Sequence, residues 1–287
     1  MSKTVLFYFT GTGNSLAIAR KIASRIENSV VIPMLNSNPA DYICEETTMI
    51  GLIYPVHMNA VPWRVAEFVK TLKLLETSYI FAVASHGGIP GLAGANLYKL
   101  AKDSQLKLDA YFEIEAINNT PKGVAPKPLM RLNWEQDITP EKVSEMMVRL
   151  EEQVDNILKA IQVHNKGLLL ESALNCKGFN YWFMSQVWKI GENSKPKLSF
   201  LLDESCTGCG LCEKLCTTRR IKMDNDKPKW VGEVCHYCYA CFNYCPVQAI
   251  GVKHYTKKLG RYHHPEISAE DLMEQVKPNK YSGGETK

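Results

Sequence analysis

Residues 4–15, Thr-Val-Leu-Phe-Tyr-Phe-Thr-Gly-Thr-Gly-Asn-Ser, are the stretch that decides the fold. Residues 4–9 are a continuous run of β-favouring residues, which is typical of a strand buried on both faces. A turn with two glycines follows, and apolar residues then recur at helical spacing from Leu16 to Ile26. A buried strand that leads through a turn into an amphipathic helix predicts a parallel sheet with helices on its faces.

The same alternation continues through the first half of the chain. Further strands are expected at residues 30–32, 49–54, 79–84 and 111–117. Helices are expected after Pro62, at residues 92–106, and from Thr139-Pro140 to about residue 165, the last with a buried stripe of Val143, Met146, Met147, Leu150, Val154, Ile157 and Ile161. This predicts an α/β domain with a five-stranded parallel sheet. Ligands of such sheets bind beyond the carboxyl ends of the strands, so the loops after strands one, three and four are the candidate site.

The loop after the first strand is the strongest candidate for an anion site in this domain. Backbone N–H groups at a helix N-terminus bind anions, and hydroxyl groups add donors. A dinucleotide fingerprint is excluded by Leu16, where that motif has glycine or alanine, and no Gly-Lys-Ser/Thr follows as in a P-loop. A loop rich in hydroxyls but without lysine suits one terminal phosphate; the alternative is a strand–helix turn that binds nothing. The candidate residues are Thr10, Gly11, Thr12, Gly13, Asn14 and Ser15.

Eight of the ten cysteines form two copies of one pattern in the last third of the chain. Each copy has the spacing C-x2-C-x2-C-x3-C, in which three cysteines bind one [4Fe–4S] cluster and the fourth binds the other. One ligand set is then Cys206, Cys209, Cys212 and Cys245, and the other is Cys235, Cys238, Cys241 and Cys216. Two zinc sites or a disulfide framework are the alternatives, although zinc ligands usually come as separated CxxC pairs.

Residues 3–165 resemble the flavodoxins, because the string Thr10–Ser15 directly after a first strand looks like their phosphate loop. With the cysteines included, the chain resembles the flavodoxin–ferredoxin fusion proteins of anaerobic bacteria and archaea. The resemblance implies FMN and two [4Fe–4S] clusters, with the flavin ring beside the second and third loops. The residues expected there are Tyr54, Pro55, Val56, His57 and Asn59, and Ser85, His86, Gly87 and Gly88.

Two features of these loops bear on how the ring would be held. The second loop lacks the tryptophan that many flavodoxins stack on the flavin, so Tyr54 or His57 is expected to cover that face. His57 and His86 either contact the flavin or are loop residues bonded to nearby backbone. Gly87 and Gly88 are expected where the backbone approaches a flat ring closely, because glycine has no Cβ.

The expected division of the chain has four parts. A flavodoxin-like domain covers residues 1–166, an aromatic helical connector 167–197, a small α+β ferredoxin domain 198–256 and a C-terminal tail 257–287. Residues 118–134 form a long insertion after the fifth strand. The connector is expected to dock the ferredoxin domain against the flavin edge, with the Cys235 motif nearer the flavin.

Composition limits the setting. The chain has 287 residues and a net charge of +4, which gives no case for nucleic-acid binding. It shows neither a secretory segment nor an apolar stretch long enough to cross a bilayer. Because the cysteines are expected to bind clusters and no secretory signal is seen, we expect a cytoplasmic protein. Exposed clusters would favour an anaerobic organism.

These features together predict an electron-transfer flavo-iron–sulfur protein. It would pass low-potential electrons between the clusters, FMN and a redox protein, either a ferredoxin-type donor or a reductase acceptor. The alternative is a flavin-dependent reductase of a small molecule fed by its own clusters. A redox-sensing binding protein is a third class. The oligomeric state is left open.

Overall fold

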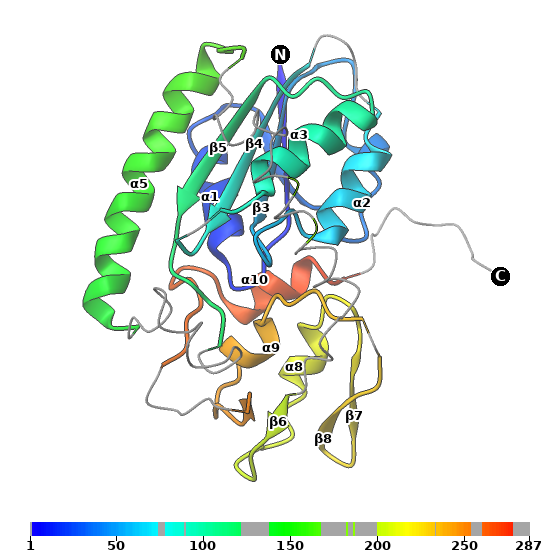
Figure 1. The fold of residues 1–287 in the computed structure, drawn as a ribbon, viewed down its shortest axis with the longest axis vertical. Coiled ribbons are helices and arrows are strands. Elements are labelled where there is room, and N and C mark those ends of the chain that lie inside the picture. Colours follow the sequence, from blue (N-terminus) through cyan, green and yellow to red (C-terminus); the bar gives the residue numbers. More distant parts are fainter. Residues whose placement is uncertain are drawn as a thin grey trace, which may run out of the picture.

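The computed structural model describes residues 2–73, 78–88, 90–121, 138–167, 182, 186, 200–232, 234–253 and 260–277. Its main element is a five-stranded sheet in which all neighbouring strands are parallel, in the order β2-β1-β3-β4-β5 (Figure 1). The strands are β1 Lys3–Tyr8, β2 Ser29–Pro33, β3 Thr47–Pro55, β4 Tyr79–His86 and β5 Ala110–Glu115. The flavodoxin-like α/β fold predicted from the sequence is confirmed.

Helices cover both faces of the sheet. Helices α1 (Asn14–Ala23) and α5 (Pro140–Gln162) pack on one face, and α2 (Trp63–Thr71) and α3 (Ala93–Asp103) pack on the other (Figure 1). A short 3₁₀ helix, η1, spans Pro39–Asp41. Helix α5 begins as predicted, because the Thr139 side chain accepts a hydrogen bond from the N–H of Lys142 at 3.4 Å and Pro140 occupies the first turn.

The first strand is buried on both faces, as its sequence indicates. Leu6 and Tyr8 join the core beneath α1 and α5, whereas Val5, Phe7 and Phe9 join the core beneath α2 and α3. Each such apolar side chain contributes about 1.5–3 kcal/mol of hydrophobic stabilisation when it is fully buried. The strand is therefore anchored inside the sheet, between β2 and β3, and holds the loop that follows it in place.

The predicted stripe of α5 is buried only over its second half. Leu150, Val154, Ile157 and Ile161 lie in the core, but Val143, Met146 and Met147 are half-buried. Val143 and Met147 line a groove together with residues 261–263 and 265. The first turns of α5 therefore face the C-terminal segment, a contact that periodicity alone does not distinguish from a sheet contact.

The cysteine-rich part forms a small α+β unit at one end of the sheet domain (Figure 1). Strand β6 (Leu201–Leu202) pairs antiparallel with β9 (Ile250–Gly251), and β7 (Ile221–Asp224) pairs antiparallel with β8 (Lys227–Trp230). Asn225 and Asp226 join β7 to β8 with positive φ angles of 47° and 57°, the conformation that two-residue hairpin turns favour. The short helices α8 (Leu211–Lys214) and α9 (Ala240–Asn243) lie within the two cysteine motifs and include Cys212 and Cys241.

The last described element is α10 (Ala269–Glu274), which lies between the sheet domain and the cysteine-rich unit (Figure 1). Ser268 caps it, with a capping box to Asp271. Leu272 is buried in the same core as α1, and Arg20 of α1 forms an ion pair with Asp271 at 2.5 Å. The part of the expected tail that the structure describes is thus packed against the sheet domain.

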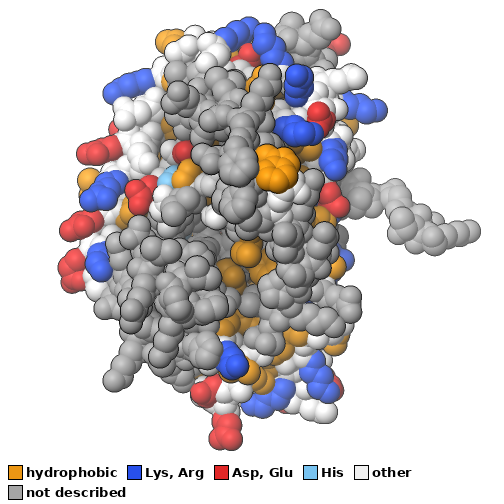
Figure 2. Space-filling model, in the orientation of Figure 1, with side chains coloured by type: hydrophobic (Ala, Val, Ile, Leu, Met, Phe, Trp, Pro, Cys, Tyr) orange, Lys and Arg blue, Asp and Glu red, His pale blue; other side chains and the backbone are white. Residues whose placement is uncertain are grey.

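Two predicted segments fall largely outside the described residues. Of the connector 167–197, only residues 167, 182 and 186 are described, and of the insertion 118–134 only residues 118–121. No helix in the described part of the chain is long and apolar enough to span a membrane. On the face shown in Figure 2, basic and acidic side chains of the described residues are interspersed.

Candidate functional site

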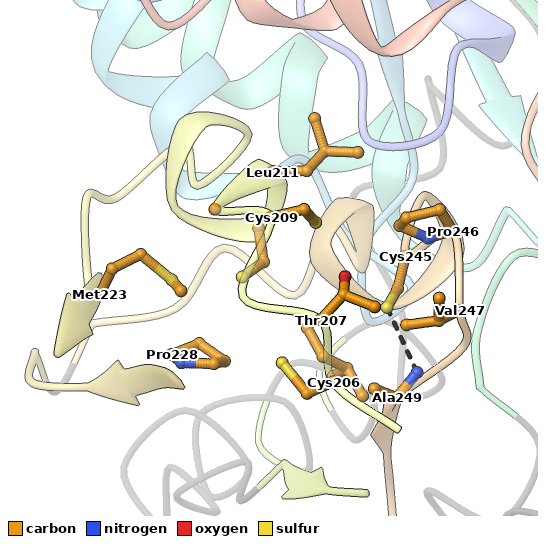
Figure 3. A pocket seen from close by; sticks show the side chains of 13 residues that line it. Cys206, Thr207, Cys209, Leu211, Met223, Pro228, Cys245, Pro246, Val247 and Ala249 are labelled. Carbon is orange, nitrogen blue, oxygen red and sulfur yellow. Dashed lines mark hydrogen bonds between the residues drawn. The ribbon is translucent and has the colours of Figure 1, made fainter. Parts of the chain in front are cut away.

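Four cysteines from both motifs line one cavity (Figure 3). Cys206, Cys209 and Cys212 come from the first motif and Cys245 from the second, and Met223 and Pro228 of the β7–β8 hairpin add apolar walls. The N–H of Ala249 donates a hydrogen bond to Cys245 Sγ at 3.2 Å. The grouping is the one that the spacing assigns to a single cluster, in an apolar shell with an N–H donor at a sulfur, both of which tune cluster potentials.

The other four cysteines also lie together. Burial, and after it the thiols of Cys238, Cys235, Cys216 and, from the first set, Cys212, raises the pKa of Cys241 well above its ordinary value. Burial likewise raises the pKa of Cys238 to about 12. Buried thiols resist ionisation unless a cation balances the charge, and metal coordination supplies that charge. The donor set therefore fits a metal cluster.

The first cysteine set surrounds a cavity. Among the described residues, no three His, Cys, Asp or Glu side chains are grouped so that they could hold one metal ion. In a [4Fe–4S] cube the four cysteines bind different irons, so the ligands surround a volume and do not converge on a point. Four cysteines around a cavity are consistent with that arrangement.

A hydroxyl and a backbone N–H lie close to sulfurs of the second set. Thr217, at the position after Cys216, has its Oγ1 3.7 Å from Cys238 Sγ and 2.7 Å from His236 Nδ1. The N–H of Tyr237 donates to Cys235 Sγ at 3.4 Å. Such donors stabilise negative charge on sulfur, which is the charge that a cluster ligand carries.

The loop after β1 retains free donors suited to a phosphate. Among the described residues, the N–H groups of Gly11, Thr12, Asn14 and Ser15 have no protein acceptor. Gly13 has a φ of 104°, which glycine adopts readily, and its N–H donates to Thr10 Oγ1 at 3.1 Å. A ring of unpaired amides at the start of a helix is an anion nest, so the loop fits the phosphate of FMN.

The three candidate loops meet at one edge of the sheet. Ser15 Oγ and Ser85 Oγ are 3.0 Å apart, and the N–H of Val56 donates to the carbonyl of Ser85 at 2.8 Å. The second and third loops are also joined by the bond from the N–H of Leu92 to the carbonyl of Asn59 at 2.7 Å. This gathering is what the strand order predicts.

The two loop histidines differ in environment. His57 lies edge-on to Phe9 with ring centroids 5.9 Å apart, both its ring nitrogens are buried without a hydrogen-bond partner, and burial lowers its pKa to about 4. His86 Nδ1 accepts the N–H of Gly88 at 3.3 Å, and burial lowers its pKa. His86 is thus bonded to nearby backbone, which was the alternative to a flavin contact. His57 is a neutral ring whose two nitrogens have no hydrogen-bond partner.

Two loop residues have internal structural roles. Tyr54 is completely buried in the core beneath α2 and α3, so of the two residues expected to cover the flavin face only His57 is placed at the edge. A Cβ on Gly87 would lie 2.6 Å from the Cβ of Asn118. The absence of a side chain at Gly87 is therefore required by Asn118, whatever else lies beside the loop.

The second cysteine motif packs directly on the loop after β1. A Cβ on Gly11 would lie 2.5 Å from the carbonyl oxygen of Cys238, so glycine is needed there for the two backbones to touch. His236, between Cys235 and Cys238, lies edge-on to Phe9 at 5.7 Å and to Trp63 at 4.6 Å. The structure thus places the motif that the sequence analysis expected nearer the flavin against the candidate phosphate loop.

Sequence reasoning missed the residues that enclose this site from the C-terminal side. They are His236, Tyr262, His264 and Gln275, all nearly fully buried. His236 could have been noted from its place inside a cysteine motif. The other three carry no local signal, because their partners are more than 200 residues away in the chain.

Comparison with known structures returns flavoprotein-type folds. A protein proposed to be a flavoprotein from Bacteroides uniformis aligns over 41% of this chain and 92% of its own at 13% identity and a TM-score of 0.34. An FMN-dependent NADH-azoreductase from Bacillus anthracis, solved with FMN, aligns over 56% of this chain and 99% of its own at 9% identity and a TM-score of 0.33. Rubredoxin oxygen:oxidoreductase from Desulfovibrio gigas aligns over 56% of this chain but only 37% of its own, at 15% identity and a TM-score of 0.31.

These likenesses are distant and carry no argument about activity. No protein-family model matches the sequence, and the comparison with curated proteins found no significant match.

Proposed function

We propose that this chain is a flavodoxin–ferredoxin fusion that transfers low-potential electrons between two [4Fe–4S] clusters, FMN and a redox protein. One observation supports this most: eight cysteines form two groups of four, and the backbone of one group touches the loop suited to a flavin phosphate. A cluster and a flavin brought this close would exchange electrons without a mobile carrier. The proposal includes the division of the chain into residues 1–166, 167–197, 198–256 and 257–287.

Each part of the proposed site has a defined task. The amides of Gly11–Ser15, with the hydroxyls of Thr12 and Ser15, would hold the phosphate. His57, Asn59, His86 and Gly88 are at the edge where the ring would lie. When bound, FMN exchanges one or two electrons and each cluster exchanges one.

The cysteine groups bind the clusters in the proposed crossed arrangement. Apolar residues such as Leu211 and Met223 exclude water from the first site. Cys209 is exposed, so a partner protein can approach this site closely. The partner would be a ferredoxin-type donor or a reductase acceptor, in the reducing cytoplasm of an anaerobe.

The reductase alternative would be favoured by a substrate-sized cavity over the flavin. Two cavities lined by described residues are the cysteine cavity and the groove between α5 and residues 261–265. Neither includes His57 or His86.

Cofactor analysis of anaerobically purified protein tests the proposal. We expect close to eight iron and eight sulfide per chain, because both ligand sets are complete, together with one FMN after reconstitution. Stoichiometric zinc with little iron would support the zinc alternative. A chain with the full iron and sulfide content that does not bind FMN would be a ferredoxin, and the proposal that it is a flavoprotein would be refuted.

A further inference from the structure

The C-terminal segment 261–276 holds the loop after β1 by specific buried contacts. The Gln275 side chain bonds both backbone groups of Thr10: its Nε2 donates to the carbonyl at 2.9 Å, and its Oε1 accepts the N–H at 3.2 Å. Gln275 is 1% exposed and Thr10 is 1% exposed, so water cannot replace these bonds. A buried donor and acceptor left unpaired are costly, which makes this amide a strong constraint on the loop.

Other residues of the segment bind further along the same loop. The N–H of His264 donates to the carbonyl of Thr12 at 2.8 Å, and the hydroxyl of Tyr262 donates to Asn14 Oδ1 at 2.7 Å. Ile267 and His264 pack on Gly13 so closely that a Cβ there would lie 2.8 Å and 2.9 Å from their Cβ atoms.

The contacts leave the anion-binding side of the loop unused. They engage the Thr10 amide and carbonyl, the Thr12 carbonyl and the Asn14 side chain. The N–H groups of Gly11, Thr12, Asn14 and Ser15, which would bind phosphate, are not among them. The segment therefore fixes the loop without competing for its donors.

The same segment forms hydrogen bonds and a cation–π contact with the second cysteine motif and the residues directly after it. Arg261 donates to the carbonyls of Gln248 at 2.8 Å and Ile250 at 2.6 Å, and its guanidinium lies 3.9 Å from the ring centroid of Phe242. The N–H of Tyr262 donates to Asn243 Oδ1 at 3.1 Å. One segment thus connects the cysteine-rich unit to the phosphate loop.

We propose that residues 261–276 are a strap that fixes the loop of the flavin phosphate site, with Gln275 as its main positioning residue. The inference rests on the proposed FMN site and deepens it: the strap holds the loop in its phosphate-binding shape and against the Cys238 backbone. The ligand it serves is a flavin with a terminal phosphate. Loss of the strap contacts loosens the loop, so the phosphate is released faster while the cysteine groups keep their cluster.

The test compares Gln275→Met with Glu270→Gln in cluster-loaded protein. Methionine keeps the volume of the side chain but removes both bonds to Thr10, whereas Glu270 is exposed on the same short helix. We expect Gln275→Met to release FMN roughly tenfold faster, as the loss of two buried hydrogen bonds implies. The release rate of riboflavin, which has no phosphate, should change by less than about twofold. The iron content of Gln275→Met should equal that of the unchanged protein. Glu270→Gln should match the unchanged protein in both release rate and iron content.

The strap proposal would be overturned if Gln275→Met released FMN at an unchanged rate, or if the variant weakened the binding of FMN and riboflavin equally. If the unchanged protein binds no flavin, the proposed function fails by itself. The strap is then judged by hydrogen exchange of residues 10–15, which should be faster in Gln275→Met than in Glu270→Gln. Equal exchange in the two variants would overturn it.

Discussion

Thr12 and Ser15 have hydroxyls that are already bonded within the loop edge, to Asn119 Nδ2 at 2.7 Å and to Ser85 Oγ at 3.0 Å. Thr12 accepts its bond, so its own proton can still be donated to a phosphate, and Ser15 can do the same when Ser85 donates the bond between them. Their side chains are almost fully buried, which strengthens such charge-assisted bonds.

Thr12→Ala should weaken FMN binding by about 1–3 kcal/mol, the range for hydrogen bonds to charged groups. Fluorescence titration of the flavin measures the change. Riboflavin is the matched control, since it lacks the phosphate and should bind equally to both proteins. Equal losses for the two flavins would mean that Thr12 supports the loop and does not contact phosphate.

Protonation of His264 should lower the free energy of unfolding at acidic pH. It is completely buried, its Nε2 has no partner, and burial lowers its pKa to about 4. In the unfolded chain the pKa is about 6.5, so the unfolded state takes up the proton first as the pH falls. The free energy of unfolding is thus fully retained above pH 6.5 and decreases between pH 6.5 and 4, by up to about 3 kcal/mol.

Denaturant midpoints of the unchanged protein and His264→Gln, measured from pH 7.5 to 4.5, check this. The variant removes the titrating ring, so its stability should depend less on pH over that range. Other buried groups and the clusters affect both proteins alike. Identical slopes would contradict the assignment.

Some residues of the candidate site could be proposed from the sequence, and others could not. The cysteines and the loop Thr10–Ser15 could be proposed as site residues because each pattern has a fixed spacing that is tied to one chemistry. Gln275 could not, because an isolated glutamine gains its role only when the fold brings it to Thr10. Gly11 was attributed to the phosphate nest, whereas its contact with Cys238 also requires glycine.

Among the elements, the two cysteine motifs are arranged so that each completes the other. Cys245 follows α9 but lines the cavity with Cys206, Cys209 and Cys212. Replacing it should therefore damage the cluster of the first motif. Paramagnetic resonance spectra of Cys245→Ala, prepared anaerobically, should show loss of that cluster and retention of the one on Cys235, Cys238 and Cys241.

The matched control is Cys216→Ala, which should produce the opposite pattern. Loss of the Cys235 cluster in Cys245→Ala would show that each motif binds its own cluster.

The strands and helices of the sheet domain were predictable to within a few residues. Buried parallel strands are continuous apolar runs, and helices such as α5 carry start signals at Thr139-Pro140. The first turns of α5 were expected to carry a buried stripe, but their stripe residues are half-buried and face residues 261–265. An amphipathic pattern shows that a face is covered and does not show which element covers it.

In the whole molecule, the carboxyl edge of the sheet is covered by the cysteine-rich unit and by α10 (Figure 1). The hydrophobic core beneath α1 extends into the cysteine-rich unit through Leu215, Ala240 and Tyr244, and into α10 through Leu272. The two units therefore share buried apolar contacts, which favours a fixed distance between them over independent motion. The arrangement follows from tertiary contacts and could be anticipated only in outline from the sequence.

The central claim is that electrons pass through the clusters to the flavin within one chain. It is tested by stopped-flow reduction of bound FMN by an external one-electron protein donor, comparing the unchanged protein with Cys212→Ala/Cys241→Ala. The double variant should lose both clusters and retain FMN, which absorbance and iron analysis verify. We predict that its flavin is reduced far more slowly by the donor, while direct reduction by dithionite is unaffected. Reduction of FMN at the native rate through that donor would show that no intramolecular route exists.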